Sequence, residues 1–294
     1  MSQSRLKNRG VALILVLMMT AILGLLILQI GLNAKENVGK AQTLLDRVSL
    51  DLELRSREAA LYYSLLTQPL GIEPNSADAY AKAWGFRGEE FSVDGATFRI
   101  QDLAGLLPFP APQSSLDEIS QYLTVIGVEG SRKEQILKSL REIQLIRLSG
   151  GDAVPLPLQS FGELSAIPEL TESEAARLSR DVTLFPLGLF NPNTAPRTVL
   201  ATKFQSESAD ILIGLRQQAD LDLGAIQRIT GQELGETLTF WSGPAFRIDA
   251  RVERAGLVAH RETTLLVLPH ESDPLIIWGQ RRMQGRELDG DSVK

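Results

Sequence analysis

The chain has 294 residues, of which 44% are hydrophobic and 22% are charged, and its formal net charge is −6. This composition is typical of a chain with at least one buried core and excludes a chain that is disordered throughout. The absence of cysteine excludes a disulfide framework, a thiolate nucleophile and a zinc site built on sulfur. Because the balance is acidic and no basic stripe follows the first residues, no nucleic-acid partner is predicted.

The first 34 residues predict a membrane segment. Arg5, Lys7 and Arg9 precede Gly10, and residues 11–32 then form a run of 22 residues without a charge. At about 1.5 Å per residue such a helix is about 33 Å long, which is enough to cross a hydrocarbon core of about 30 Å. The basic residues place the short N-terminus in the cytoplasm and the rest of the chain on the other side of the membrane.

Three interpretations of this segment compete. A cleaved secretory signal is disfavoured because its apolar region usually has about 7–15 residues, and because the exit at residues 32–34 puts a large leucine at position −3. An uncleaved signal anchor fits the length and the charges. The sequence around Gly10 also resembles a prepilin-type signal, in which cleavage after Gly10 leaves Val11 as the new N-terminus. Most subunits with that signal carry Glu at the fifth mature position; this chain has Leu15 there, which implies a subunit at a filament tip.

Helical periodicity continues beyond the membrane segment. No proline occurs between residues 11 and 68, so one rod through residue 66, about 84 Å long, is predicted. Its apolar stripe is expected to pack on a sheet and its opposite face on other subunits. The stripe consists of Val38, Ala41, Leu45, Val48, Leu52, Ala59, Tyr62 and Leu66.

Two strand hairpins are predicted, one on each side of a helical stretch. Residues 90–101 alternate in polarity around a turn at Asp94 and Gly95. The second hairpin pairs residues 245–252 with residues 261–268. Beyond Pro269 the chain is charged and is predicted to be a flexible tail, in which the apolar residues 276–278 fit an exposed patch and a covered sheet edge equally well.

The stretch between the hairpins begins with a proline-rich joint at residues 107–112 and is predicted to be helical. Ser114 or Ser115 is expected to cap the first helix, and Thr171 with Glu174 forms a capping box. The expected helices span residues 115–127, 131–148, 161–166, 171–178, 197–203, 206–218 and 223–230.

Motifs for catalysis and metal binding are scarce. His260, expected in a hairpin turn, and His270 flank the last predicted strand rather than cluster, and no serine-hydrolase, zinc-protease or phosphate-loop motif occurs. The sequence therefore predicts no enzyme activity and no cofactor. No metal site is predicted either, because the candidate acids lack the Asp-x-Asp spacing of a calcium loop. These acids are Asp152, Glu163, Glu169 and Glu172.

Residues 193–218 have the length of a helix-hairpin-helix unit, which binds the DNA backbone through a glycine-rich connection. Here the connection at residues 204–207 has no glycine and contains Glu207, so the unit is interpreted as packing. The side chains of Asn191, Asn193 and Thr194 are expected to cap the helix that follows.

Five short motifs in this order resemble the minor pseudopilin K family of the type II secretion pathway. They are RGVAL at residues 9–13, RIQDLAG at 99–105, SFGEL at 160–164, DVTLFP at 181–186 and FNPNTAPRTVL at 190–200. The chain departs from the family at residues 106–109, where members have an asparagine-rich stretch. It departs again at residues 139–144, where members have an acidic segment often associated with calcium.

The resemblance implies an α+β fold: a long N-terminal transmembrane and amphipathic helix, a pilin-like antiparallel sheet lobe, and a large α-helical domain inserted between its strands. It implies a prepilin-type leader at residues 1–10, a transmembrane helix at 11–34 and a pilin-like lobe at 35–107. The inserted helical domain then spans residues 108–239, the C-terminal hairpin 240–269 and the tail 270–294.

The resemblance also implies a function. A minor pseudopilin of this kind caps or initiates the periplasmic pseudopilus at its tip, together with the minor pseudopilins I and J and the pseudopilus shaft. Prepilin peptidase would cut between Gly10 and Val11, and Leu15 would matter for assembly. The mature protein would cross the inner membrane once, with its C-terminal part in the periplasm. A signal-anchored periplasmic adaptor and a minor pilin-like component of a type IV pilus system remain as alternatives.

Overall fold

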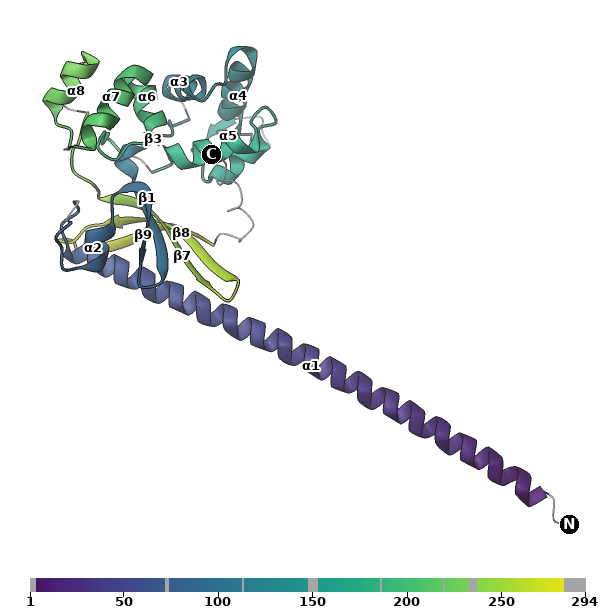
Figure 1. The fold of residues 1–294 in the computed structure, drawn as a ribbon. Helices are drawn as coiled ribbons and strands as arrows, with labels where there is room; N and C mark the ends of the chain where they lie inside the picture. The colour runs from purple at the N-terminus through teal and green to yellow at the C-terminus, as the bar shows by residue number, and fades with distance from the viewer. Residues whose placement is uncertain are drawn as a thin grey trace.

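The computed structural model describes residues 4–71, 74–112, 114–147, 153–185, 187–218, 220–232 and 237–282. Its most prominent element is helix α1 (Ser4–Thr67), an unbroken rod whose N-terminal half projects far from the rest of the molecule (Figure 1). The helix ends immediately before Gln68 and Pro69. The single long rod predicted from the lack of proline is therefore present.

The C-terminal part of α1 packs on a five-stranded antiparallel sheet. Its strands are β1 (Arg87–Val93), β2 (Ala96–Asp102), β7 (Ala245–Arg254), β8 (Leu257–Val267) and β9 (Leu275–Arg282), in the spatial order β1-β2-β7-β8-β9. The turn between β1 and β2 lies at Asp94 and Gly95, which both have positive φ angles, 52° and 80°. A two-residue hairpin turn of this kind favours glycine and aspartate because both central residues adopt left-handed backbone angles.

One apolar core joins α1 to the sheet. The α1 side chains Leu50, Leu54, Leu61 and Leu65 are 2% exposed or less, and their spacing of four and seven residues keeps them on one face of the helix. The short helix α2 (Ala79–Ala83) closes the end of this core, with Asp78 accepting hydrogen bonds from the first amides of the helix.

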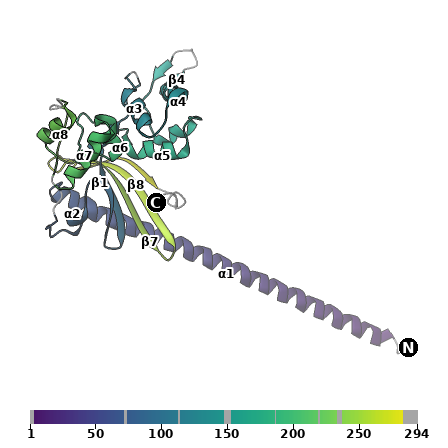
Figure 2. The same ribbon diagram turned by 45° about the horizontal axis from the view of Figure 1, so that its top comes forward.

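The chain between β2 and β7 forms a second, mainly helical body. The sheet lies between α1 and this body in both ribbon views (Figures 1 and 2). Its α-helices are α3 (Asp117–Val125), α4 (Gly130–Ile143), α5 (Glu172–Asp181), α6 (Arg197–Phe204), α7 (Ser206–Arg216) and α8 (Leu223–Thr230). Two 3₁₀ helices, η1 (Leu103–Gly105) and η2 (Phe161–Ala166), and four short strands complete it: β3 (Leu107–Pro108), β4 (Leu145–Arg147), β5 (Ala153–Pro155) and β6 (Val182–Thr183).

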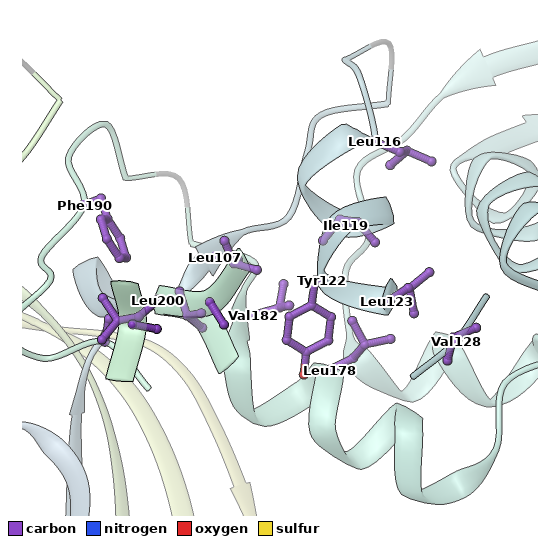
Figure 3. Close-up of a cluster of buried hydrophobic side chains, with 14 of the residues drawn as sticks. Leu107, Leu116, Ile119, Tyr122, Leu123, Val128, Leu178, Val182, Phe190 and Leu200 are labelled. Carbon is purple, nitrogen blue, oxygen red and sulfur yellow. The ribbon is translucent and has the colours of Figure 1, made fainter. Parts of the chain in front are cut away.

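The helical body has a core of its own, separate from the core under α1. Figure 3 shows Tyr122 of α3 among Leu123, Leu178 and Val182, which come from different elements. The hydroxyl of Tyr122 is satisfied inside this core because it donates to Asp181 at 2.9 Å. The α+β architecture predicted from the sequence is confirmed: a long apolar helix on an antiparallel sheet, with helices inserted between two of its strands.

Three local predictions are wrong. The helix predicted to reach residue 148 ends at Ile143, and Leu145–Arg147 pairs with Ala153–Pro155 as a short hairpin. The first helix of the body has Leu116 at its N-cap without a side-chain hydrogen bond, although the hydroxyl of Ser115 accepts from the amide of Asp117. The tail predicted beyond Pro269 contains strand β9, because Ile276 and Ile277 pair with β8 along the sheet edge and Trp278 lies at a register shift beside them.

Candidate assembly surfaces

The N-terminal half of α1 offers a long apolar surface. Side chains from Leu13 to Leu32 face outward, and Leu15 is 54% exposed. This helix is long and apolar enough to cross a membrane, with a mean hydropathy of 2.8 in its most apolar window. Gly10 and Val11 lie within the helical backbone of α1, but the side chain of Val11 is outside the described part of the structure.

A second apolar surface follows on α1 beyond the membrane segment. The side chains of Val38, Leu45, Val48 and Leu52 are between 58% and 69% exposed. They belong to the stripe predicted to pack on the sheet, and this prediction is wrong for them. The sheet begins to cover α1 only at Leu50 and meets the face that carries the buried leucines. The part of the predicted stripe from Val38 to Leu52 is therefore free, whereas Tyr62 and Leu66 at its C-terminal end pack on the core.

A buried ion cluster holds α1 on the sheet. Arg261 of β8 is 4% exposed and donates to Glu58 at 2.5 Å and to Asp51 at 2.8 Å. Arg282 of β9 reaches the same oxygen of Asp51 at 2.8 Å. Burial raises the pKa of Glu58 above its ordinary value, and the positive charge of Arg261 opposes this shift. The cluster fixes where along α1 the sheet sits, because the two carboxylates are two helical turns apart.

A second buried carboxylate joins the sheet to the helical body. Asp102, at the end of β2, is fully buried and accepts from the side chains of Asn191 at 2.9 Å and Thr194 at 3.0 Å. It also accepts from the amide of Ala104 at 3.0 Å, and the amide of Asn191 donates to the carbonyl of Ala104 at 2.8 Å. Burial raises the pKa of Asp102 to about 6, against the effect of these hydrogen bonds.

The expected helix caps at residues 191–194 are therefore wrong. Helix α6 has Pro196 at its N-cap and no side-chain cap, and Asn191 and Thr194 are turned toward Asp102 instead. The side chain of Asn193 instead bonds within the helical body. It donates to the carbonyl of Leu221 at 3.2 Å and accepts from the amide of Leu221 at 2.8 Å.

Two further contacts connect the lobes away from this junction. Arg247 of β7 donates to the carbonyls of Ser179, Arg180 and Val182 at the C-terminal end of α5, at 2.7 to 3.1 Å. A cation at a helix C-terminus satisfies carbonyls that have no partner within the helix. The ring of Trp278 of β9 packs edge-on against Phe185 at 5.1 Å.

The described residues bring no three His, Asp or Glu side chains together as metal ligands. His260, expected in a hairpin turn, lies within β8, and its Nε2 is 3.2 Å from Asp249 across the strand pair. A cavity of about 420 Å³ in the helical body is lined by Leu106, Phe190 and Phe204 among others, and Lys203 forms an ion pair with Glu118 there. Among the described residues, neither the pair of His260 and Asp249 nor this cavity brings a nucleophile next to a general base.

Gly105 marks how closely the two lobes approach. A Cβ at this position would lie 2.7 Å from the backbone carbon of Thr194 and 2.8 Å from the nitrogen of Ala195. We expect Gly105→Ala to lower the free energy of unfolding by about 1–3 kcal/mol, as overpacking of a rigid contact does. Gly214→Ala in α7 is the control: it meets nothing within 4 Å, and is expected to stabilise the protein by about 1 kcal/mol. Denaturant unfolding of both variants measures the difference.

No family model and no curated protein matches this chain. The fold itself is pseudopilin-like. The chain is similar to a chain of the crystal structure of the GspK-GspI-GspJ complex from the type 2 secretion system of enterotoxigenic Escherichia coli, with a TM-score of 0.50 and 14% identity. The match covers 84% of this chain and 99% of that chain.

Proposed function

We propose that this chain is a minor pseudopilin of K type that caps or initiates the pseudopilus of a type II secretion system at its tip. The observation that carries the proposal is the helical body, whose six α-helices are inserted between β2 and β7 on the side of the sheet opposite α1 (Figures 1 and 2). A filament shaft repeats by packing α1 helices side by side. A body of this size on every subunit would hinder such packing, whereas one copy at the end would not.

The two apolar surfaces of α1 support the same proposal. The segment before Leu32 would be held in the inner membrane before assembly and in the filament core afterwards. The free stripe with Val38, Leu45 and Leu52 would pack on neighbouring subunits, for which the minor pseudopilins I and J are the proposed partners at the tip and the shaft subunits below it. The rest of the chain would lie in the periplasm. As part of this proposal we retain the leader at residues 1–10, the transmembrane segment at 11–34 and the inserted domain at 108–239.

Leu15 fits the end of a filament rather than its shaft. A carboxylate at the fifth mature position pairs with the N-terminal ammonium of a neighbouring subunit, and a buried carboxylate without such a partner is costly. A subunit at the very tip has no neighbour above it to supply that partner. An apolar residue at this position is therefore what the tip position favours.

The processing site gives the most direct test. We expect prepilin peptidase to cut after Gly10, so that intact-mass analysis of membrane-extracted protein finds a chain that begins at Val11. In cells without the peptidase, and for Gly10→Leu in cells with it, the full-length mass should remain. Gly24→Leu is the matched control: it lies in the same apolar run, away from the cleavage site, and should be processed normally.

Other results of this experiment would replace the proposal. An unprocessed N-terminus in the presence of the peptidase would make the chain a signal-anchored adaptor with the same fold. A processed chain that co-purifies with type IV pilus subunits and not with type II secretion components would place it in a pilus machine.

A further inference from the structure

The cluster around Asp102 lies where the helical body enters and leaves the sheet lobe. The chain leaves the sheet at the end of β2 and returns at β7, where Asp102 and Phe246 are cross-strand partners. Four groups donate to the buried carboxylate: the side chains of Asn191 and Thr194 and the backbone amides of Ala104 and Gly243. The side chain of Asp102 therefore connects the end of β2, the chain just before β7 and the helical body.

Two of the donors have a second acceptor within reach. The hydroxyl of Thr194 lies 3.0 Å from Asp102 and 3.4 Å from the carbonyl of Asn191. The side-chain amide of Asn191 lies 2.9 Å from Asp102 and 3.1 Å from the carbonyl of Trp241. The hydroxyl group can donate or accept, so this network has a complete hydrogen-bond pattern for two protonation states of the acid.

The two patterns differ by one proton taken from solvent. When Asp102 is ionised, Thr194 donates to it. When Asp102 is protonated on Oδ2, its O–H donates to the Thr194 oxygen and the Thr194 hydroxyl turns its proton to the carbonyl of Asn191. In the second pattern the buried charge disappears while the hydrogen bonds across the junction are retained, so the cost of burying a charge is removed.

Within the described ranges of the chain, the charged side chains around the junction bond to groups other than Asp102. Arg87 donates to the carbonyl of Asn193 at 3.0 Å, and Arg216 donates to the carbonyls of Pro192 and Ala195 at 3.3 and 2.6 Å. Glu89 interacts with Arg216, Asp220 lines the neighbouring cavity, and Arg247 is bound to the end of α5. Because none of the cations that the structure describes pairs with the carboxylate, acidification has no ion pair among these residues to break.

We propose that the junction at Asp102, Asn191 and Thr194 is a proton-operated latch that holds the helical body on the sheet more firmly at acidic than at neutral pH. This proposal does not depend on the pseudopilin role, since it concerns two lobes of one chain. Burial raises the pKa of Asp102 to about 6, above its ordinary value of 3.8. A pKa raised in the closed state gives a stabilising effect that is present at low pH and is lost as the pH rises through 6.

Hydrogen exchange of the full-length protein in detergent tests the latch. The reporters are the amide of Asn191, which donates to the carbonyl of Ala104 across the junction, and the amide of Ala104, which donates to the carboxylate of Asp102 itself. After correction for the intrinsic exchange rate, we expect the protection of these amides to rise about tenfold when the pH is lowered from 7.5 to 5. This factor follows if Asp102 has a pKa of about 6 in the closed junction and its ordinary pKa of 3.8 when opening exposes it to water. A pH-independent protection, or a fall on acidification, would overturn the proposal.

Two variants separate Asp102 from other titrating groups. Asp102→Asn resembles the protonated acid, because its amide can donate to Thr194, and the rise on acidification should be absent from it. Thr194→Val keeps the shape but removes a hydrogen bond to the ionised carboxylate that holds the pKa of Asp102 down, so the rise on acidification should begin at a higher pH and be larger. If Asp102→Asn shows the same tenfold rise as the unmodified protein, another group is responsible and the latch is wrong; if Asp102→Asn does not fold, the Thr194→Val comparison decides alone.

Discussion

A chain from which residues 103–245 are removed is expected to be inserted in the membrane and processed, yet to support almost no secretion. The structure shows where to join the ends. Asp102 and Phe246 are directly paired in the antiparallel ladder, so an Asn-Gly turn between them closes a simple hairpin of β2 and β7. The core under α1 draws its side chains from α1, α2 and the sheet and is left intact.

The expected defect follows from the size of the part removed. Without the helical body the subunit has the proportions of a shaft subunit, and the steric reason for its place at the tip is gone. Secretion of an exported reporter enzyme into the medium measures the loss, and cross-linking from the free stripe of α1 at Leu45 reports which subunits it meets. We expect contacts with shaft subunits to increase and contacts that depend on the tip to disappear.

The full-length Gly214→Ala chain is the control for expression and handling, because it changes only an open helix surface and should secrete normally. Normal secretion by the shortened chain would refute the capping role of the helical body. Loss of membrane insertion in the shortened chain would instead show that the sheet lobe depends on the body, which the separate cores of the two lobes argue against.

Features set by neighbouring residues could be predicted from the sequence. The turn at Asp94 and Gly95 needs two left-handed residues in a row, and the capping box of Thr171 and Glu174 needs only three residues of separation. Both are present in the structure. The inserted helices were predictable for the same reason, because the periodicity of their apolar residues lies within each helix.

Features set by distant residues could not be predicted. Asn191 and Thr194 have the composition of a helix cap, and nothing near them in the chain indicates Asp102, which is 89 residues before Asn191 and 92 before Thr194. On α1 the sequence offers two apolar stripes, one with Leu45 and Leu52 and one with Leu50 and Leu54. Only the position of the sheet decides which is buried, so the prediction that Leu45 and Leu52 face the sheet is wrong.

Arg261→Met is expected to lower the free energy of unfolding of the sheet lobe by about 3–5 kcal/mol, because it leaves the buried carboxylate of Glu58 without its partner. Glu58 is 3% exposed, and its Oε1 already lacks a hydrogen-bond partner, so it depends on Arg261 for its other oxygen. Denaturant unfolding followed by the fluorescence of Trp84, which is buried in the same core, measures the change.

Two variants in the same lobe make this result specific. Arg99→Met breaks an exposed ion pair with Glu90 on neighbouring strands, 3.0 Å long, and should cost less than about 1 kcal/mol. The double variant Glu58→Leu with Arg261→Met removes both members of the most buried pair, and should recover most of the loss because an apolar pair replaces an unpaired charge. If Arg261→Met costs no more than Arg99→Met, the ion cluster does not hold α1 on the sheet, and the leucines beneath the helix do so alone.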